Sequence, residues 1–300
     1  MTRWAWLWTG LAAAGLALGA SAATGEQVDW TALDPDFAGA TFVGDDAVCA
    51  DCHEEYEKAY AATRHAQAFR LGGATGNCES CHGPRSAHVE NPGNELAFSA
   101  LTPARQSAVC LQCHEGGARM AWKSGVHSSS EVSCTSCHHV MERQSDRALL
   151  IRDNSSEGCL TCHADVRAKM RRTSHHPVRE GRLECASCHD PHGSTAPALL
   201  RGNTVNEACL SCHTEKRGPF VWEHAPVRES CLNCHDAHGS NNRTLLTAKD
   251  SFLCLQCHSY GGHSNLPRYN RTSNPYGQGC VNCHFSVHGS NHPSGAKLTR

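Results

Sequence analysis

Aromatic side chains are scarce in this 300-residue chain, which has 7 Phe, 6 Trp and 5 Tyr. Gly and Pro number 26 and 12, so long regular elements and a large side-chain core are both disfavoured. Excess positive charge is also missing, because the net charge is −2, and this excludes the basic field of a nucleic-acid-binding protein. Such a chain needs something other than apolar side chains to fill its interior.

Long apolar runs are absent except at the N-terminus. Arg3 is followed by an apolar stretch over residues 4–20 and by the small residues Ala20-Ser21-Ala22. This pattern predicts that residues 1–22 are a secretory signal peptide cleaved after Ala22. An uncleaved N-terminal anchor is the alternative interpretation, because the apolar run is nearly long enough to span a membrane. Export would place the mature protein in the periplasm.

Cysteine and histidine are the residues in excess, at 20 and 22. The motif Cys-x-x-Cys-His occurs ten times and uses all twenty cysteines. Two thiols at this spacing, on a short helical turn, can each add to one vinyl group of haem, and the next residue then lies under the iron. Zinc knuckles do not require His after every second Cys, and a disulfide scaffold does not require His at all. The repeat therefore predicts ten covalently bound haem c groups.

The motifs are numbered 1 to 10 along the chain. The predicted thioether sites are Cys49, Cys52, Cys78, Cys81, Cys110, Cys113, Cys134, Cys137, Cys159, Cys162, Cys185, Cys188, Cys209, Cys212, Cys231, Cys234, Cys254, Cys257, Cys280 and Cys283. The predicted proximal iron ligands are His53, His82, His114, His138, His163, His189, His213, His235, His258 and His284.

Twelve further histidines are available for ten sixth coordination positions, so nearly complete bis-histidine ligation is expected. The chain divides into five two-motif units, each with one His before its second motif and another His soon after it. This pattern predicts the distal ligands His65, His88, His127, His192, His224, His238, His263 and His288. His175 and His176 remain alternatives for one position, and His292 is a spare.

The second unit departs from this pattern. Three residues after His138, where His192 follows His189, the chain has Met141, and His139 lies directly beside the proximal ligand. We expect Met141 to be the sixth ligand here, which would raise the potential of one haem. Ligation by His139, or a simple packing role for Met141, are the alternatives.

Few long elements are expected. The predicted fold is a multihaem cytochrome c, mostly loops with short α-helices wrapped around a haem chain and little or no β-sheet. Residues 23–48 form a haem-free, extended N-terminal arm, with Trp30 and Phe42 as possible anchors. Residues 49–300 form the decahaem domain, and Glu54–Arg70 is its clearest helix.

The chain resembles the MtrA/PioA/DmsE decahaem cytochromes from about residue 45 onward. The likeness rests on the ten motifs and on Arg119-Met120-Ala121-Trp122, Trp222-Glu223-His224-Ala225-Pro226 and Val287-His288-Gly289-Ser290-Asn291-His292-Pro293-Ser294-Gly295. It implies two pentahaem halves, at approximately 49–180 and 181–300. It also implies that the Ser-His-Pro element at 174–177 supplies His176 as a ligand. Met141 is a departure, since many relatives have His there.

The resemblance implies a ten-haem wire inside an outer-membrane β-barrel porin, held at the periplasmic side of that membrane. Its partners would be the porin, a periplasmic electron carrier and, as a further candidate, an extracellular multihaem cytochrome. The chain would link periplasmic carriers to an extracellular donor such as Fe(II) or an acceptor such as a metal oxide. A freely diffusing periplasmic carrier is the alternative. A multihaem reductase is disfavoured, because all ten motifs end in His, so electron transfer rather than catalysis is expected.

Overall fold

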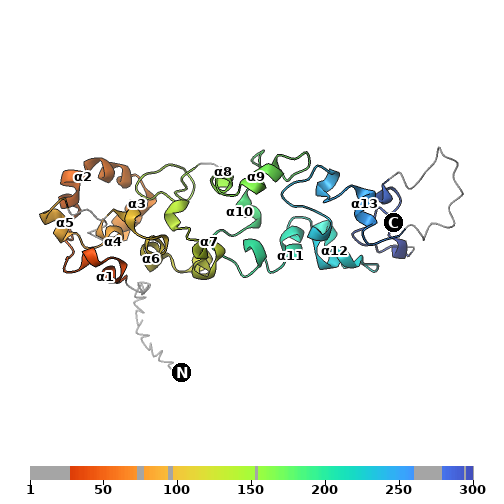
Figure 1. The fold of residues 1–300 in the computed structure, drawn as a ribbon, viewed down its shortest axis with the longest axis horizontal. Helices are drawn as coiled ribbons and strands as arrows, with labels where there is room; N and C mark the ends of the chain where they lie inside the picture. Colours follow the sequence, from red (N-terminus) through yellow and green to blue (C-terminus); the bar gives the residue numbers. More distant parts are fainter. Residues whose placement is uncertain are drawn as a thin grey trace, which may run out of the picture.

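The computed structural model describes residues 28–72, 78–93, 97–152, 155–259, 279–293 and 295–299. Over these residues the molecule is elongated, and its elements follow one another along the long axis in sequence order (Figure 1). Helices α1 to α5 lie at one end and α13 at the other. The predicted signal peptide and the predicted ligand His263 both lie outside the described residues.

The described residues form short helices joined by loops, with no β-strand and only isolated antiparallel bridges. The α-helices are α1 (Trp30–Leu33), α2 (Asp46–Ala61), α3 (Arg64–Gly72), α4 (Glu79–His82), α5 (Ser86–Glu90), α6 (Pro103–His114), α7 (Val126–Ser129), α8 (Ser155–Leu160), α9 (Ala164–Met170), α10 (Cys185–Cys188), α11 (Val205–Leu210), α12 (Ala225–Glu229) and α13 (Asp250–Cys254). Single 3-10 turns include η5 (Cys134–Ser136), η8 (Cys231–Asn233) and η12 (Cys280–Asn282). The expected helix-and-loop fold class is confirmed. Of the helices in the described ranges, none combines the length and apolar character needed to cross a bilayer.

Local sequence signals set where several of these helices begin. The Asp45 carboxylate accepts a hydrogen bond from the amide of Ala47 and caps α2. Thr102 caps α6, whose first residue is Pro103, and Thr204 caps α11. Such caps satisfy amides that have no partner within the helix, and each contributes about 1 kcal/mol. As a result, motif 1 lies within α2, motif 3 at the end of α6, and motif 7 at the end of α11.

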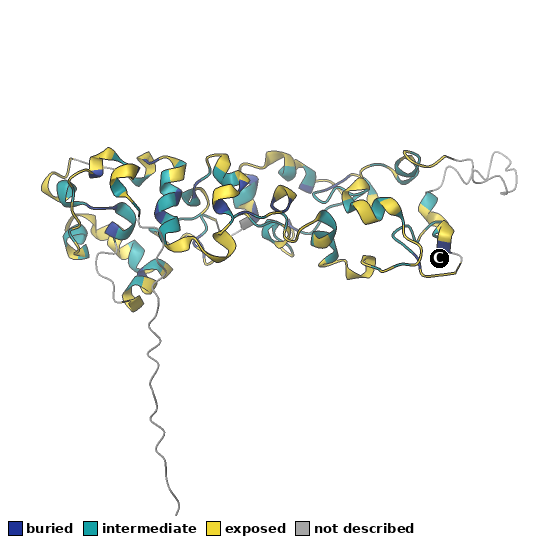
Figure 2. Ribbon diagram, turned by 90° about the horizontal axis from the view of Figure 1, so that it is seen from below, coloured by how far each residue is buried: buried dark blue, intermediate teal, exposed yellow. Residues whose placement is uncertain are grey.

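Side chains alone build only a small core. The buried apolar residues are scattered along the chain, and Thr63 is the only described side chain that is fully enclosed. Figure 2 shows this distribution, with isolated buried positions among exposed and half-buried ones. The scarcity of aromatics in the sequence thus has a direct structural counterpart, because no large layer of apolar side chains is formed.

The N-terminal arm differs from the expected extended segment. Its described part contains α1 and the 3-10 turn Pro35–Phe37, and Trp30 packs edge-on against Phe37 with ring centroids 5.5 Å apart. Phe42 is 57% exposed, so it is not an anchor in this structure. The predicted helix Glu54–Arg70 is two helices, α2 and α3, which are separated by Ala62 and Thr63.

The buried carboxylate of Glu79 fastens this arm to motif 2. Its oxygens accept hydrogen bonds from the amides of Val43, Gly44 and Arg85, at 3.0, 2.8 and 2.9 Å. Glu79 is only 2% exposed. A buried carboxylate is costly unless its lone pairs are satisfied, and here three backbone donors satisfy them.

Candidate haem-binding sites

Each motif makes one helical turn. In eight of the ten motifs, the His amide donates to the carbonyl of the first Cys at 2.9 to 3.1 Å, as in His82 to Cys78. Motif 3 lies inside α6, and motif 1 lies inside α2, which is kinked at His53. Residues at positions i, i+3 and i+4 of a helical turn share one face. Both thiols and the imidazole of a motif therefore face the same side, which is the arrangement that a covalently attached haem requires.

Eight proximal histidines face a second imidazole at nearly the same distance. Two metal–imidazole bonds of about 2 Å each, with the added distance from each nitrogen to its own ring centre, place two imidazoles on one metal ion with centroids about 6 Å apart. The observed centroid distances are 5.8 to 6.3 Å, in the pairs His53–His88, His65–His114, His127–His163, His138–His192, His176–His213, His189–His238, His224–His258 and His235–His288. These residues fit eight iron ions with two axial imidazoles each.

The pairs follow a simple order along the chain. We call His65, His127, His176 and His224, each placed before an even motif, the leading histidines, and His88, His192, His238 and His288, each placed after one, the trailing histidines. Every leading histidine faces the proximal His of the next odd motif, as His127 faces His163. The last three trailing histidines reach back two motifs, as His192 faces His138, whereas His88 faces His53 of motif 1.

Backbone carbonyls orient the proximal histidines of four even motifs. The Nδ1 atoms of His138, His189, His235 and His284 lie 2.6 to 2.8 Å from the carbonyl oxygens of Ala148, Ala198, Thr244 and Lys297. An Nδ1–H that donates to a carbonyl leaves Nε2 deprotonated and able to ligate iron, and it fixes the ring orientation. In motifs 4, 6 and 8 the carbonyl belongs to a residue with positive φ, such as Ala198 at 53°. The left-handed turn thus presents the carbonyl to the imidazole.

Two leading histidines are held in the same way by the trailing segments. His127 Nδ1 lies 2.9 Å from the Pro191 carbonyl oxygen, and His176 Nδ1 lies 2.8 Å from that of Ala237. Pro191 and Ala237 directly precede the trailing ligands His192 and His238. One backbone segment therefore carries one candidate ligand and orients another, which couples neighbouring sites.

The structure favours His176 over His175. His175 is engaged at both ring nitrogens, because Nδ1 lies 2.7 Å from the Arg172 carbonyl oxygen and Nε2 lies 3.2 Å from the Glu180 carboxylate. The backbone hydrogen bond to Arg172 and the contact with Glu180 raise the pKa of His175. His176 instead faces His213 at 6.3 Å. This agrees with the ligand that the family resemblance implied.

His82 has a distinct environment. Burial lowers the pKa of His82 to about 4, so its imidazole is neutral near pH 7, the form that ligates metal ions. Its ring contact is with Phe98, at 6.0 Å and 72° between planes, and not with another histidine. Gly83 beside it packs under Trp30 and Phe37 of the N-terminal arm. The arm therefore covers the neighbourhood of motif 2.

The two motifs of each unit are joined through their first cysteines. The side chains of Cys49 and Cys78 contact each other, and the same holds for the pairs Cys110–Cys134, Cys159–Cys185, Cys209–Cys231 and Cys254–Cys280. These contacts place the thioether edges of two haem sites side by side. The ten motifs are thus arranged as five two-motif units, in agreement with the division made from the sequence.

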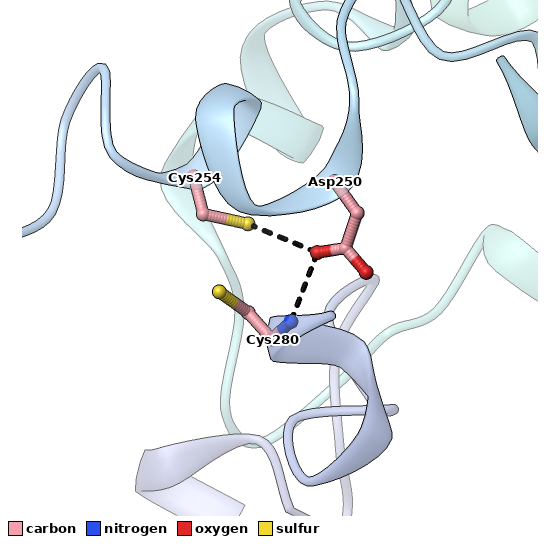
Figure 3. A group of neighbouring side chains, drawn as sticks. All are labelled: Asp250, Cys254 and Cys280. Carbon is pink, nitrogen blue, oxygen red and sulfur yellow. Dashed lines mark hydrogen bonds between the residues drawn. The ribbon is translucent and has the colours of Figure 1, made fainter. Parts of the chain in front are cut away.

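A polar residue upstream of each odd motif bridges the two motifs of its unit. Asp46, Asn206 and Asp250 accept hydrogen bonds from the amides of Cys78, Cys231 and Cys280, at 3.0, 2.8 and 3.0 Å. Figure 3 shows Asp250 between Cys254 and Cys280. Ser107 and Ser156 hold the equivalent positions beside the thiols of Cys134 and Cys185. We call these five residues the bridging residues.

Sequence reasoning missed the bridging residues, although a signal was present. A polar side chain lies three residues before Cys49, Cys110, Cys159 and Cys209, and four residues before Cys254. The oxygen of Asp250 and the two sulfurs near it lie close enough together to hold a metal ion. Both cysteines belong to Cys-x-x-Cys-His motifs, so we assign them to thioether bonds and not to a separate metal site.

One continuous cavity of about 5040 Å³ extends along the molecule and is lined by residues of all ten motifs, from Val28 to Leu298. Pockets for one small ligand are roughly 300–1,000 Å³. The cavity therefore suits a row of large prosthetic groups better than one substrate. Together with the matched imidazole pairs and the thiol-bearing turns, it shows that the described residues fit haem.

Comparison with known proteins agrees with this geometry. The family described as "Doubled CXXCH motif" matches residues 127–168, 175–218 and 224–263. The multiheme cytochrome MtrA of Shewanella baltica is 38% identical over 297 residues. The match covers 92% of this chain and 88% of that protein. The chain belongs to the MtrA family of multihaem cytochromes. The resemblance stated from the motifs is thereby confirmed.

A solved structure of lower similarity was also found, an undecaheme cytochrome from the S-layer of Carboxydothermus ferrireducens. It is 19% identical, covers 76% of this chain and 33% of that chain, and has a TM-score of 0.15, which carries no structural argument. Membership of the MtrA family shows the cofactor and the general role of the chain. The chain binds haem c covalently, transfers electrons, and is not an enzyme.

Proposed function

We propose that this chain holds ten haems c and conducts electrons along its length, inside a β-barrel porin of the outer membrane. It would link a periplasmic electron carrier to an extracellular donor or acceptor, and an extracellular multihaem cytochrome is a candidate for the far end. The row of imidazole pairs along one elongated molecule carries this proposal. Eight pairs with centroids 5.8 to 6.3 Å apart succeed one another from His53 to His288.

Haem supplies a one-electron couple at each iron, and the chain's residues would set how it is used. The cysteines would tether each haem. The proximal histidines would hold the iron through Nε2, because a backbone carbonyl is bound to Nδ1 of residues such as His189. Distal ligands would close the second face and exclude substrates, which favours electron transfer over catalysis. The count of ten rests on the motifs, and the proposed distal set is His65, His88, His127, Met141, His176, His192, His224, His238, His263 and His288.

The irregular backbone of the chain supports the proposed setting inside a porin. Irregular backbone cannot face lipid, because its amides and carbonyls would lack hydrogen-bond partners there. A closed barrel with a polar lumen can accommodate such a chain. The hydrocarbon layer is about 30 Å thick, a distance that a row of haems can exceed. We further propose that residues 1–22 are removed on export and that the mature chain acts from the periplasmic side.

The test is purification of the cytochrome from membranes of its host, followed by reconstitution in liposomes that enclose a reduced redox dye. The cytochrome should co-purify with a porin, and the liposomes should pass electrons from the dye to an external oxidant. Liposomes with the porin alone are the control and should stay reduced. Recovery of the cytochrome only in the soluble periplasmic fraction would favour the diffusing carrier instead. A high-spin haem in the resting protein would reopen the case for a reductase.

A further inference from the structure

Two described proximal histidines, His82 of motif 2 and His284 of motif 10, lie outside the eight imidazole pairs, and the order of the pairs bears on His82. Three of the four trailing histidines reach back by two motifs: His192 faces His138 at 6.1 Å, His238 faces His189 at 6.0 Å and His288 faces His235 at 6.2 Å. These are the trailing ligands of motifs 6, 8 and 10. The trailing segment of motif 4 should serve motif 2 by the same rule. The proximal residue of motif 2 is His82, whose ring contact is with Phe98.

Backbone hydrogen bonds align the trailing segment of motif 4 with the others. The amide of Asp190 donates to the Leu199 carbonyl at 2.7 Å, and the amide of Asp236 donates to the Leu245 carbonyl at 2.8 Å. The amide of His139 makes the same bond to the Leu149 carbonyl at 2.7 Å. His139 therefore occupies the position of these aspartates, directly after the proximal ligand. Two residues further on, at the position of His192 and His238, the chain has Met141.

The same segment lies against the first two-motif unit. Other trailing segments dock just upstream of a leading histidine, as Gly239 packs on the Lys169 backbone and Ser240 pairs with Ser174, before His176. After Met141, residues Arg143, Ser145 and Leu149 line a small cavity together with Ala62, Arg64 and Gln67. These last residues flank the leading ligand His65. The segment after Met141 therefore docks as the other trailing segments do, beside a leading histidine of the preceding two-motif unit.

The spacing within this segment also explains why a longer side chain replaces His. The trailing ligand and the serine after it are two residues apart in His192–Ser194, His238–Ser240 and His288–Ser290. The buried Ser145 comes four residues after Met141, and no glycine lies between them. The backbone therefore lacks the close glycine contact of the other segments. An unbranched thioether with three rotatable bonds can adapt to this difference.

We propose that His82 and Met141 are the two axial ligands of one iron, that of the haem attached to Cys78 and Cys81. Of the other described histidines in question, His175 is held by Arg172 and Glu180, and His139 takes the position of Asp190 and Asp236 rather than that of a trailing ligand. This inference rests on the proposed ten-haem function and assigns one of its sites. His/Met ligation raises the reduction potential of a haem relative to bis-histidine ligation, and burial under the N-terminal arm would raise this potential further. The second haem from the N-terminal end is then the preferred resting place for an electron on the wire.

The first experiment uses the complete holoprotein and the charge-transfer band that methionine ligation gives to ferric haem in the near infrared. Wild type should show this band at an intensity of one haem in ten. Met141→His should abolish the band and remove one high-potential component from a redox titration, with all ten haems still present by mass. The control is Met120→Leu, because Met120 is 76% exposed, and it should leave the band unchanged. Persistence of the band in Met141→His would overturn the proposal.

The second experiment assigns the band to a motif. A Cys78→Ala/Cys81→Ala variant should lose one haem by mass and the whole band. A Cys134→Ala/Cys137→Ala variant is the matched control, since it removes the haem site next to Met141 in sequence, and it should keep the band. The reverse result would overturn the pairing with His82. If either variant fails to fold, nuclear magnetic resonance of wild type labelled with ¹³C-methyl methionine decides. In the reduced state, the shifted methyl signal should show Overhauser contacts to the macrocycle bound by Cys78 and Cys81. Contacts to another macrocycle would overturn the pairing.

Mass measurement separates the two levels of the account. Ten added haems without a methionine band would refute the axial pair and leave the conduit proposal intact. Far fewer haems would refute the ten-haem function itself, whatever the spectrum shows.

Discussion

Ser174 and Ser240 exchange two backbone hydrogen bonds, of 2.9 and 2.8 Å, although they belong to different two-motif units. The same antiparallel contact joins Trp222 and Ser290 one unit later. Each contact lies two residues from a pair of candidate axial ligands, such as His176 and His238. The chain thus uses a minimal bridge between units to align ligands for two different haems.

This docking requires a glycine at position 239. Gly239 has φ of 148°, and a Cβ at this position would collide with the Lys169 backbone. We expect Gly239→Ala to separate the segments, to destabilise the protein by about 1–3 kcal/mol, and to weaken ligation by His238. Denaturant unfolding and the low-spin haem signal measure both effects. Gly116→Ala is the control, because nothing lies within 4 Å of its Cβ position and its φ is −88°. Equal stability of the two variants would contradict the docking argument.

The neighbouring histidines 175 and 176 should differ in their effect on haem ligation. His176→Ala removes the imidazole that faces His213, so one haem should become high-spin. His175→Ala removes contacts with Arg172 and Glu180 only and should leave every haem low-spin. Electron paramagnetic resonance of the oxidised proteins distinguishes the two. A high-spin signal from His175→Ala, with none from His176→Ala, would reverse the assignment.

A bridging residue can be tested at Asn206. Its side chain accepts from the Cys231 amide at 2.8 Å and donates to the Val227 and Arg228 carbonyl oxygens at 3.0 Å each. Asn206→Leu leaves these backbone groups unsatisfied and should cost about 1–3 kcal/mol in the free energy of unfolding. The exposed Asn203, changed to Leu, provides the comparison. The bridging role would be wrong if both variants unfolded at the same denaturant concentration.

The buried carboxylate of Glu79 should hold the N-terminal arm in place. Glu79→Gln replaces one acceptor oxygen with a donor that faces backbone amides, so the arm should loosen from motif 2. Faster limited proteolysis before residue 46 is the expected result, compared with Glu90→Gln at an exposed position. Unchanged cleavage would show that the apolar contacts of Trp30 and Phe37 suffice.

Covalent haem binding could be predicted from the sequence because the chemistry of its motif is local. Cys-x-x-Cys-His fits one helical turn, so its meaning needs no knowledge of the fold. Axial pairing depends on distant contacts instead: nothing near His138 in the sequence indicates that His192 faces it. The choice between His175 and His176 likewise needed the position of Glu180.

Other features had no recognisable sequence signal. The left-handed turns that orient proximal histidines occur at Ala198 and Leu199, and at Thr244 and Leu245, where glycine or asparagine would normally mark positive φ. The carbonyls of Ala198 and Thr244 in these turns contact the imidazoles of His189 and His235. The expected helix at Glu54–Arg70 is divided at Ala62 and Thr63, and Thr63 is fully buried.

The most direct test of the central claim is the mass of the mature holoprotein, read together with its electron paramagnetic resonance spectrum. The account predicts residues 23–300 with ten covalently added haems, all of them low-spin with two axial ligands. A polypeptide with clearly fewer haems, or several irons that readily bind small exogenous ligands, would contradict it.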